Sequence, residues 1–179
     1  TSPDKLLDQY QSWIQLLLQD QSLSQGLSVM GILHSWFTIQ ISQLSILILG
    51  VLLLLLPLIR RKFYESENFR LNYLASLLIW LVIFNHKAES PTYIIAMSGA
   101  GLWFFSQKLS RANILLAGLA FILTSLSPTD LFPKAVRDSM IIPYQLKAIP
   151  CVLIWIKIQL DLWFMSEPKH VVVPPENQP

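Results

Sequence analysis

An uncharged apolar run over residues 42–59 constrains this chain more than any other feature of its sequence. The run reads SQLSILILGVLLLLLPLI and ends at the basic triplet of residues 60–62. A helix of about 20 apolar residues crosses the roughly 30 Å hydrocarbon core of a bilayer, and basic residues at a helix end mark the cytoplasmic side in most membrane proteins. The run therefore predicts a first transmembrane helix, kinked near its end by Pro57, with the residues before Ser42 outside the cytoplasm.

The composition agrees with a membrane protein. Hydrophobic residues make up 53% of the chain and charged residues 13%, against about a quarter charged in soluble domains. The net charge of +2 is too small to indicate a nucleic-acid partner. Cys151 is the only cysteine, so it cannot form a disulfide within the chain, and its apolar surroundings favour a buried, inert thiol. The sequence has no phosphate-binding glycine loop and no metal-ligand spacing, so we expect no cofactor and no metal.

Four more apolar segments follow the first one, separated by polar turns that often contain proline. They extend over residues 71–84, 92–105, 114–126 and 145–165. In the last segment Lys157 and Asp161 are four residues apart, a spacing that lets them pair on one helix face. Together the segments predict an all-α membrane protein, a multi-pass transmembrane helix bundle of about five spans.

The two ends of the chain differ from this bundle. Ser2, Pro3 and Asp4 form a helix start. The apolar residues that follow at helical spacing are Leu6, Leu7, Tyr10, Trp13, Ile14, Leu17 and Leu18. They predict an extracytoplasmic amphipathic helix on the membrane surface or on its neighbours. The chain starts at Thr1 with neither methionine nor a basic n-region, so we expect a missing N-terminal part and no signal peptide. Residues 1–165 are predicted as one domain and the proline-rich tail 166–179 as disordered.

Three polar clusters fall on the predicted extracytoplasmic face, at residues 20–22, 85–90 and 127–138. Ionisable groups near a bilayer are costly and tend to be functional, so these clusters predict a site on that face. Within the second cluster, His86 has the chemistry to transfer a proton or to bind a phosphate. The alternatives are a solvated turn for the second cluster and a helix cap for Asp130.

Three segments resemble glycosyltransferase family 87, once described as a domain of unknown function. Residues 20–33, DQSLSQGLSVMGIL, resemble its Asn-Gln-Ser-Leu-x-Gly-Leu segment, with Asp20 where many members have asparagine. Residues 84–96, FNHKAESPTYIIA, and 123–134, LTSLSPTDLFPK, resemble its C-terminal region. The Ser-Pro pair here follows His86, whereas many members place such a pair before their histidine. The resemblance covers most of the chain, to about Leu162.

The resemblance implies a multi-pass GT-C-type enzyme that transfers a hexose, typically mannose, from a polyprenyl-phosphate donor to an extracytoplasmic acceptor with inversion. The catalytic aspartate of the family lies in its first extracytoplasmic loop, for which this chain has no candidate. The chain would then be a C-terminal part, inactive alone, that contacts the donor phosphate and the acceptor. The residues expected to do so are His86, Lys87, Glu89, Ser90, Gln21, Ser22, Asp130 and Lys134.

The predicted helix N-termini at Ser90 and Ser127 suit the binding of a leaving phosphate. The cations Lys87, Lys134 and Arg137 suit it as well. The partners implied are a lipid-linked sugar donor, membrane lipids and a glycan or glycolipid acceptor, at a bacterial inner membrane. The alternative is a small membrane transporter or scaffold subunit without catalytic activity. Lys157 and Asp161 inside a span favour it, but the sequence lacks the internal repeat that is typical of transporters.

Overall fold

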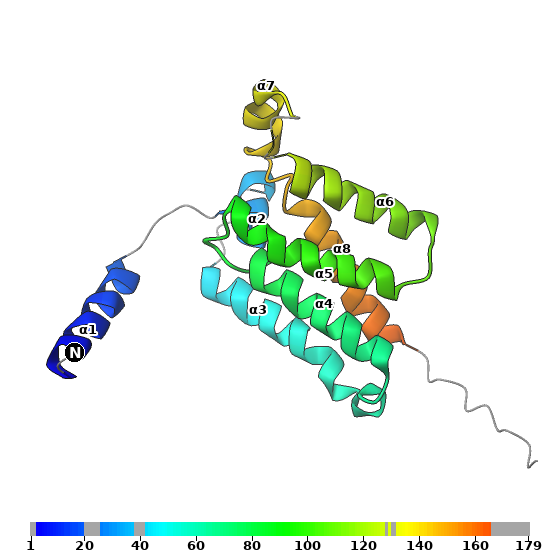
Figure 1. The fold of residues 1–179 in the computed structure, drawn as a ribbon, viewed down its shortest axis with the longest axis horizontal. Helices are drawn as coiled ribbons and strands as arrows, with labels where there is room; N and C mark the ends of the chain where they lie inside the picture. The colour runs from blue at the N-terminus through cyan, green and yellow to red at the C-terminus, as the bar shows by residue number, and fades with distance from the viewer. Residues whose placement is uncertain (1–2, 20–25, 38–41, 128, 130–131, 166–179) are drawn as a thin grey trace, which may run out of the picture.

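The computed structural model describes residues 3–19, 26–37, 42–127, 129 and 132–165 of the 179 residues, and in these the regular elements are helical (Figure 1). The α-helices are α1 (Pro3–Gln19), α2 (Val29–Phe37), α3 (Gln43–Leu55), α4 (Glu67–Ile83), α5 (Tyr93–Ser106), α6 (Arg111–Ala120), α7 (Lys134–Val136) and α8 (Ile149–Phe164). Tighter 3₁₀ turns span Leu56–Ile59, Arg61–Phe63 and Ser90–Thr92, and wider π turns span Phe121–Leu126 and Arg137–Ile141. The prediction of helical structure is therefore confirmed, while the predicted disordered tail lies outside the described residues.

The prediction of a multi-pass transmembrane bundle is wrong. None of the helices in the described part of the chain combines the length and the apolar character needed to cross a membrane. The physical reason is visible in α3, which holds 13 residues and then passes into the 3₁₀ turn Leu56–Ile59. At 1.5 Å per residue, 13 residues extend roughly 20 Å, short of the roughly 30 Å of a hydrocarbon core. Pro57 lies in this 3₁₀ turn, where a residue without an N–H cannot continue the α-helical hydrogen bonds.

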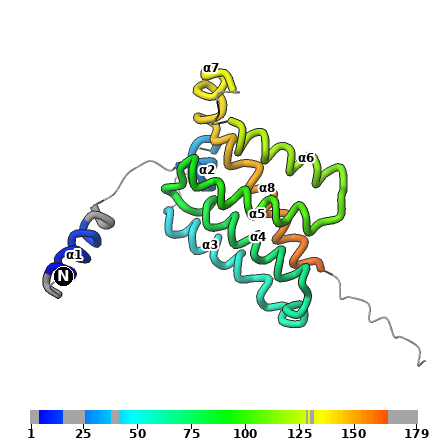
Figure 2. Tube along the Cα trace, in the orientation of Figure 1, coloured from blue at the N-terminus to red at the C-terminus, as the bar shows by residue number. Residues whose placement is uncertain are grey.

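The helices pack around α4 and α8. In Figure 1, α3, α4, α5 and α6 lie side by side in chain order, and α8 crosses behind them; the Cα trace in Figure 2 shows the same order. Helix α8 packs against α4, α5 and α6, and α4 packs against α3 and α5. The core lies between them and includes side chains with no exposed surface: Ala75, Ile79, Ala96, Trp103, Cys151, Ile154 and Ile158. The prediction of a buried Cys151 thiol is thereby confirmed.

Helix α1 lies apart from the other described helices (Figure 1). Five apolar residues of its predicted stripe are at least half exposed: Leu6, Leu7, Tyr10, Trp13 and Ile14. The helix itself is confirmed, and the surface on which its apolar side would lie stays a prediction.

Arg60, the first residue of the basic triplet, joins the turn after α3 to the C-terminal end of α8 by hydrogen bonds. Its Nη1 donates to the carbonyl oxygens of Leu162 at 2.9 Å and Trp163 at 2.6 Å, and its Nη2 donates to the carbonyl oxygen of Met165 at 2.7 Å. Carbonyl groups at a helix C-terminus lack partners within the helix and carry partial negative charge. The guanidinium therefore caps α8, and it also lies 4.1 Å from the centre of the Phe63 ring.

Gly99 sets the close approach of α4 and α5. A Cβ atom at this position would lie 2.8 Å from the carbonyl oxygen of Ala75 and 2.9 Å from Cγ1 of Ile79. Gly101, two residues further along α5, has open space where its Cβ would be. Gly99 thus marks a close contact between two helices, as small residues often do, whereas Gly101 has no such neighbour.

We predict opposite effects for alanine at these two glycines. Gly99→Ala is expected to lower the free energy of unfolding by about 1–3 kcal/mol, because a backbone carbonyl of α4 must move to make room. Gly101→Ala is expected to raise it by about 0.5–1 kcal/mol, because alanine favours the helix and meets no atom. Denaturant unfolding of both variants measures the difference, and equal effects at the two sites would contradict the packing described for α5.

Candidate functional site

The turn between α4 and α5 carries the second polar cluster, and its shape comes from local hydrogen bonds. Asn85 accepts the backbone N–H of Lys87 on its side-chain oxygen at 3.0 Å and the N–H of Ala88 on its carbonyl at 3.0 Å. The 3₁₀ turn Ser90–Thr92 then leads into α5, with Glu89 as the residue before it. Ser90 is therefore the first residue inside the turn, and its side chain does not cap the turn. The chain arrives at α5 with Pro91 near the helix start, as proline prefers.

Residues 26–28 pack on this turn. The Leu27 N–H donates to the Ala88 carbonyl at 3.2 Å, and the Tyr93 hydroxyl donates to the Leu27 carbonyl at 2.7 Å. Gly26 has φ +50°, and a Cβ there would lie 2.5 Å from the carbonyl oxygen of His86. Only glycine fits such a position without strain. The segment that follows the first polar cluster is thus held against the second cluster.

A pocket of about 420 Å³ opens at the start of α5. It lies between the 3₁₀ turn Ser90–Thr92, the π turn Phe121–Leu126 and the residues just before α8. We call it the Lys147 pocket, and its lining residues are Ser90, Pro91, Tyr93, Ile94, Met97, Thr124, Ser125 and Lys147. Three segments that are distant in sequence therefore meet at one concave place, which is the usual form of a small-molecule site.

Lys147 is the unusual residue of this pocket, because only 3% of it is exposed. Its Nζ donates to the Ser90 carbonyl at 3.4 Å and lies 5.2 Å from the centre of the Tyr93 ring. Its own carbonyl accepts the Thr124 hydroxyl at 2.9 Å. Burial lowers the pKa of Lys147, since an ammonium group loses its hydration there, while the nearby Cys151 opposes the shift. A buried lysine without a carboxylate partner is rare and costly.

The groups around the Lys147 amine carry no negative charge near neutral pH. Burial raises the pKa of Cys151 to about 11, against smaller opposing effects of Thr124 and Lys147, so the thiol stays protonated. Burial likewise raises the pKa of Tyr93. No described carboxylate lies within ion-pair distance of Lys147, and the carboxylates of Asp138 and Asp161 pair with other cations. The positive end of α5 adds to the local potential, so the pocket is suited to an anion.

The structure describes five of the eight predicted site residues, and Gln21, Ser22 and Asp130 lie outside the described part of the chain. Ser90 lines the pocket. His86 and Lys87 are half-buried in the turn before it, and Glu89 is exposed there. Lys134 is exposed at the start of α7, away from the residues that line the pocket. The structure thus places Ser90 in the same pocket as Lys147 and Thr124. These two were not predicted as site residues from the sequence.

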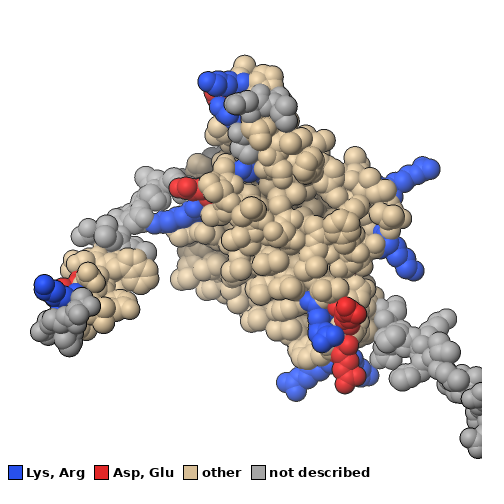
Figure 3. Space-filling view, in the orientation of Figure 1, with Lys and Arg blue, Asp and Glu red and all other residues tan. Residues whose placement is uncertain are grey.

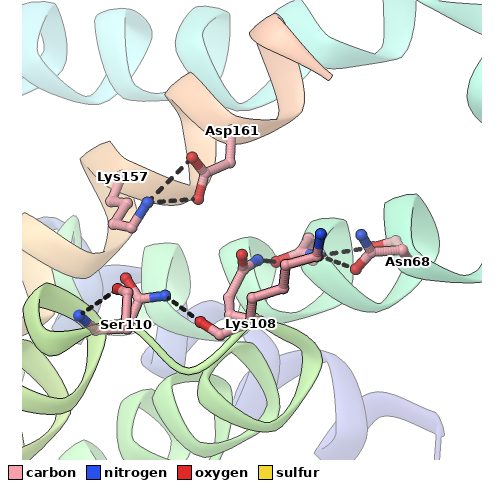
Figure 4. Close-up of polar contacts among 8 residues, drawn as sticks. Asn68, Lys108, Ser110, Lys157 and Asp161 are labelled. Carbon is pink, nitrogen blue, oxygen red and sulfur yellow. Dashed lines mark hydrogen bonds and ion pairs between the residues drawn. The ribbon is translucent and has the colours of Figure 1, made fainter. Parts of the chain in front are cut away.

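A second group of polar residues lies at the opposite end of α5 and serves the fold (Figure 4). Gln107 donates to the side chain of Asn72 at 2.8 Å, and Asn72 donates to that of Asn68 at 2.7 Å. Ser110 caps α6 by accepting the Asn113 N–H at 3.1 Å. On α8, Lys157 and Asp161 pair at 2.9 Å, as their spacing predicted. The hydrogen bonds of Gln107 and Ser110 thereby position the α5–α6 turn.

Lys147 could have been found from one feature of the sequence. It is a lone cation that precedes the apolar run AIPCVLIWI, inside the segment predicted as the fifth span. A charge in that place is a candidate for function or for a buried contact, but which groups face it depends on how the start of α8 packs on α5.

Comparisons with known proteins identify no relative of this chain. A scan against protein-family models, a search of curated proteins and a search of solved structures each found no match.

Proposed function

We propose that this protein binds the phosphate of a polyprenyl-phosphate-linked hexose in the Lys147 pocket and takes part in transferring that hexose to a glycan or glycolipid acceptor with inversion. The observation that carries the proposal is the buried Lys147 amine, which faces a pocket at the start of α5 without a carboxylate from the described residues. The resemblance of three segments to glycosyltransferase family 87 supports the choice of ligand.

The chemistry explains why a cation belongs beside this phosphate. In an inverting transfer the acceptor oxygen attacks the anomeric carbon while the bond from that carbon to the phosphate oxygen breaks. The electron pair of the broken bond goes to the phosphate, whose negative charge increases. Lys147 and the hydroxyl groups of Ser90 and Ser125 line the pocket and are the kinds of group that stabilise such charge. No carboxylate or imidazole lines the pocket among the residues described, so we do not assign acceptor deprotonation to it.

The surface around the bundle suits a ligand with a long apolar chain. Leu52 on α3, Phe105 on α5 and Leu115 on α6 are 60%, 87% and 72% exposed. In the view of Figure 3 the charged side chains lie toward the margins of the bundle, and the broad centre is uncharged. Exposed apolar surface of this extent is typical of proteins that contact lipid or other proteins. Lipids, including the polyprenyl chain of the donor, are therefore the partners that we propose.

We predict that Lys147→Gln weakens the binding of geranyl phosphate about 10- to 100-fold. Hydrogen bonds from a charged donor contribute about 1.5–3 kcal/mol, and glutamine keeps a polar side chain of similar length without the charge. Titration calorimetry with the purified protein measures the affinity. Lys157→Gln is the matched control, because Lys157 lies on α8 but pairs with Asp161 rather than facing the pocket.

Two outcomes would contradict the proposal. Equal binding by wild type and Lys147→Gln would remove Lys147 from the phosphate site. A wild-type protein that binds neither geranyl phosphate nor a polyprenyl-phosphate hexose would favour the scaffold alternative.

A further inference from the structure

The Lys147 amine has no negatively charged partner among the described residues around its pocket. Among the described residues, the groups that face the Lys147 amine are neutral: the Tyr93 ring of α5 and the Ser90 carbonyl contact it, and the protonated Cys151 thiol of α8 lies nearby. The Thr124 hydroxyl binds the Lys147 carbonyl rather than its amine. Of the three N–H donors of an ammonium group, one reaches the Ser90 carbonyl at the long distance of 3.4 Å. Neither the described residues nor solvent contact, at 3% exposure, supplies the partners that a buried positive charge requires.

We propose that the Lys147 pocket takes up a proton together with its phosphate ligand, and that it therefore binds a phosphomonoester dianion in preference to a phosphodiester monoanion. The proton comes from solvent and adds to the Lys147 nitrogen, converting –NH₂ to –NH₃⁺ in those molecules whose amine is neutral before the anion enters. This inference rests on the proposed function, because it assumes that the pocket binds phosphate.

The direction of the coupling follows from the two states of the pocket. In the empty pocket burial lowers the pKa of Lys147, whereas a bound anion beside the amine raises that pKa. Affinity for the dianion is then greatest below the pKa of the empty pocket. It falls as the pH rises from that value to the pKa of the occupied pocket, by up to about tenfold per pH unit.

The coupling also predicts which of the two phosphate species of the proposed reaction, the donor or the product, binds more tightly. The donor is a phosphodiester with one negative charge, and loss of the hexose leaves a phosphomonoester that carries close to two charges near neutral pH. A pocket that gains its positive charge with the ligand holds the more highly charged species more firmly. The polyprenyl phosphate left after transfer is thus the tighter ligand, and it should inhibit the reaction by competing with the donor.

The test is titration calorimetry with geranyl phosphate between about pH 7.5 and 10, where this probe stays a dianion because its second pKa is about 6. Repeating each titration in two buffers of different ionisation enthalpy gives the number of protons taken up. We expect net proton uptake in wild type, greatest where the pH lies between the pKa values of the free and the occupied pocket, and an affinity that falls with pH. Methyl geranyl phosphate, a monoanion, should bind at least tenfold more weakly, and uncharged geraniol more weakly still.

Two variants at position 147 provide the controls. In Lys147→Arg the guanidinium stays protonated throughout this range, so binding should persist without proton uptake and without the fall in affinity. Lys147→Gln should bind weakly at every pH and also take up no proton. If wild type binds geranyl phosphate with no proton uptake and a flat pH profile, the proton coupling is wrong although the phosphate site stands. If wild type fails to bind geranyl phosphate at any pH, the proposed function itself fails.

Discussion

Replacing Trp103 with alanine is expected to lower the free energy of unfolding by about 3–5 kcal/mol. Trp103 lies in α5, and its side chain has no exposed surface, which makes it the bulkiest of the fully buried residues described. Removing it leaves a cavity where α5 faces the core, and the surrounding helices can collapse into it only in part. Because whole domains are stable by about 5–15 kcal/mol, this single change should move the urea midpoint strongly, as measured by circular dichroism.

Two variants separate core packing from the loss of a tryptophan as such. Trp103→Phe keeps an aromatic ring and removes an indole N–H that has no hydrogen-bond partner in the described structure, so we expect less than half the loss of Trp103→Ala. Trp13→Ala removes a side chain of α1 that is 58% exposed, and its effect should stay within about 0.5 kcal/mol. Similar losses at positions 13 and 103 would contradict the core described for α5.

On the proposed function, His86→Ala is expected to lower the turnover of sugar transfer about 10²- to 10³-fold, the usual cost of removing one donor to a developing anion. His86 lies in the turn that leads through Ser90 into the Lys147 pocket. His86 is not among the residues that line the pocket. The prediction therefore requires the bound phosphate to extend from the pocket to this turn, where the imidazole can donate a hydrogen bond that strengthens as the leaving phosphate gains charge. Its half-buried side chain has no hydrogen bond to another described residue, so the melting temperature should change little.

The control for this prediction is a second histidine. His34 is exposed on α2, and His34→Ala should leave both turnover and melting temperature unchanged. Unchanged turnover in His86→Ala would remove that residue from the site. A large fall in its melting temperature would instead make the role of His86 structural.

Local features of the fold were readable in the sequence because they depend on neighbours along the chain. Pro57 marks the end of the α-helix α3, and the spacing of Lys157 and Asp161 predicts their ion pair. The prediction of a membrane-spanning bundle was wrong because hydropathy counts apolar residues and does not report where a helix ends. The run 42–59 stays apolar after α3 gives way to a 3₁₀ turn at Leu56. In the same way the apolar segment 114–126 continues after α6 has become a π turn at Phe121.

The candidate site could be predicted only in part, because its key contact joins residues distant in the chain. Ser90 was expected from its Ser-Pro start, but its partner Lys147 lies 57 residues away. That contact exists because the start of α8 packs beside the start of α5, and no local pattern encodes this pairing. The glycine at position 26 is a similar case, since its positive φ and its approach to the His86 carbonyl appear only in the folded chain.

The cap that Arg60 forms on α8 also has a consequence for the order in which the protein is made. The carbonyl oxygen of Leu162, its first acceptor, lies 102 residues further along the chain. At a synthesis rate of about 5–20 residues per second, Arg60 precedes that acceptor by roughly 5–20 s. Over this interval the turn after α3 leaves the ribosome without the groups that will hold it. The bundle can therefore close at this end only after α8 has been synthesised, which makes this closure a late step of co-translational folding.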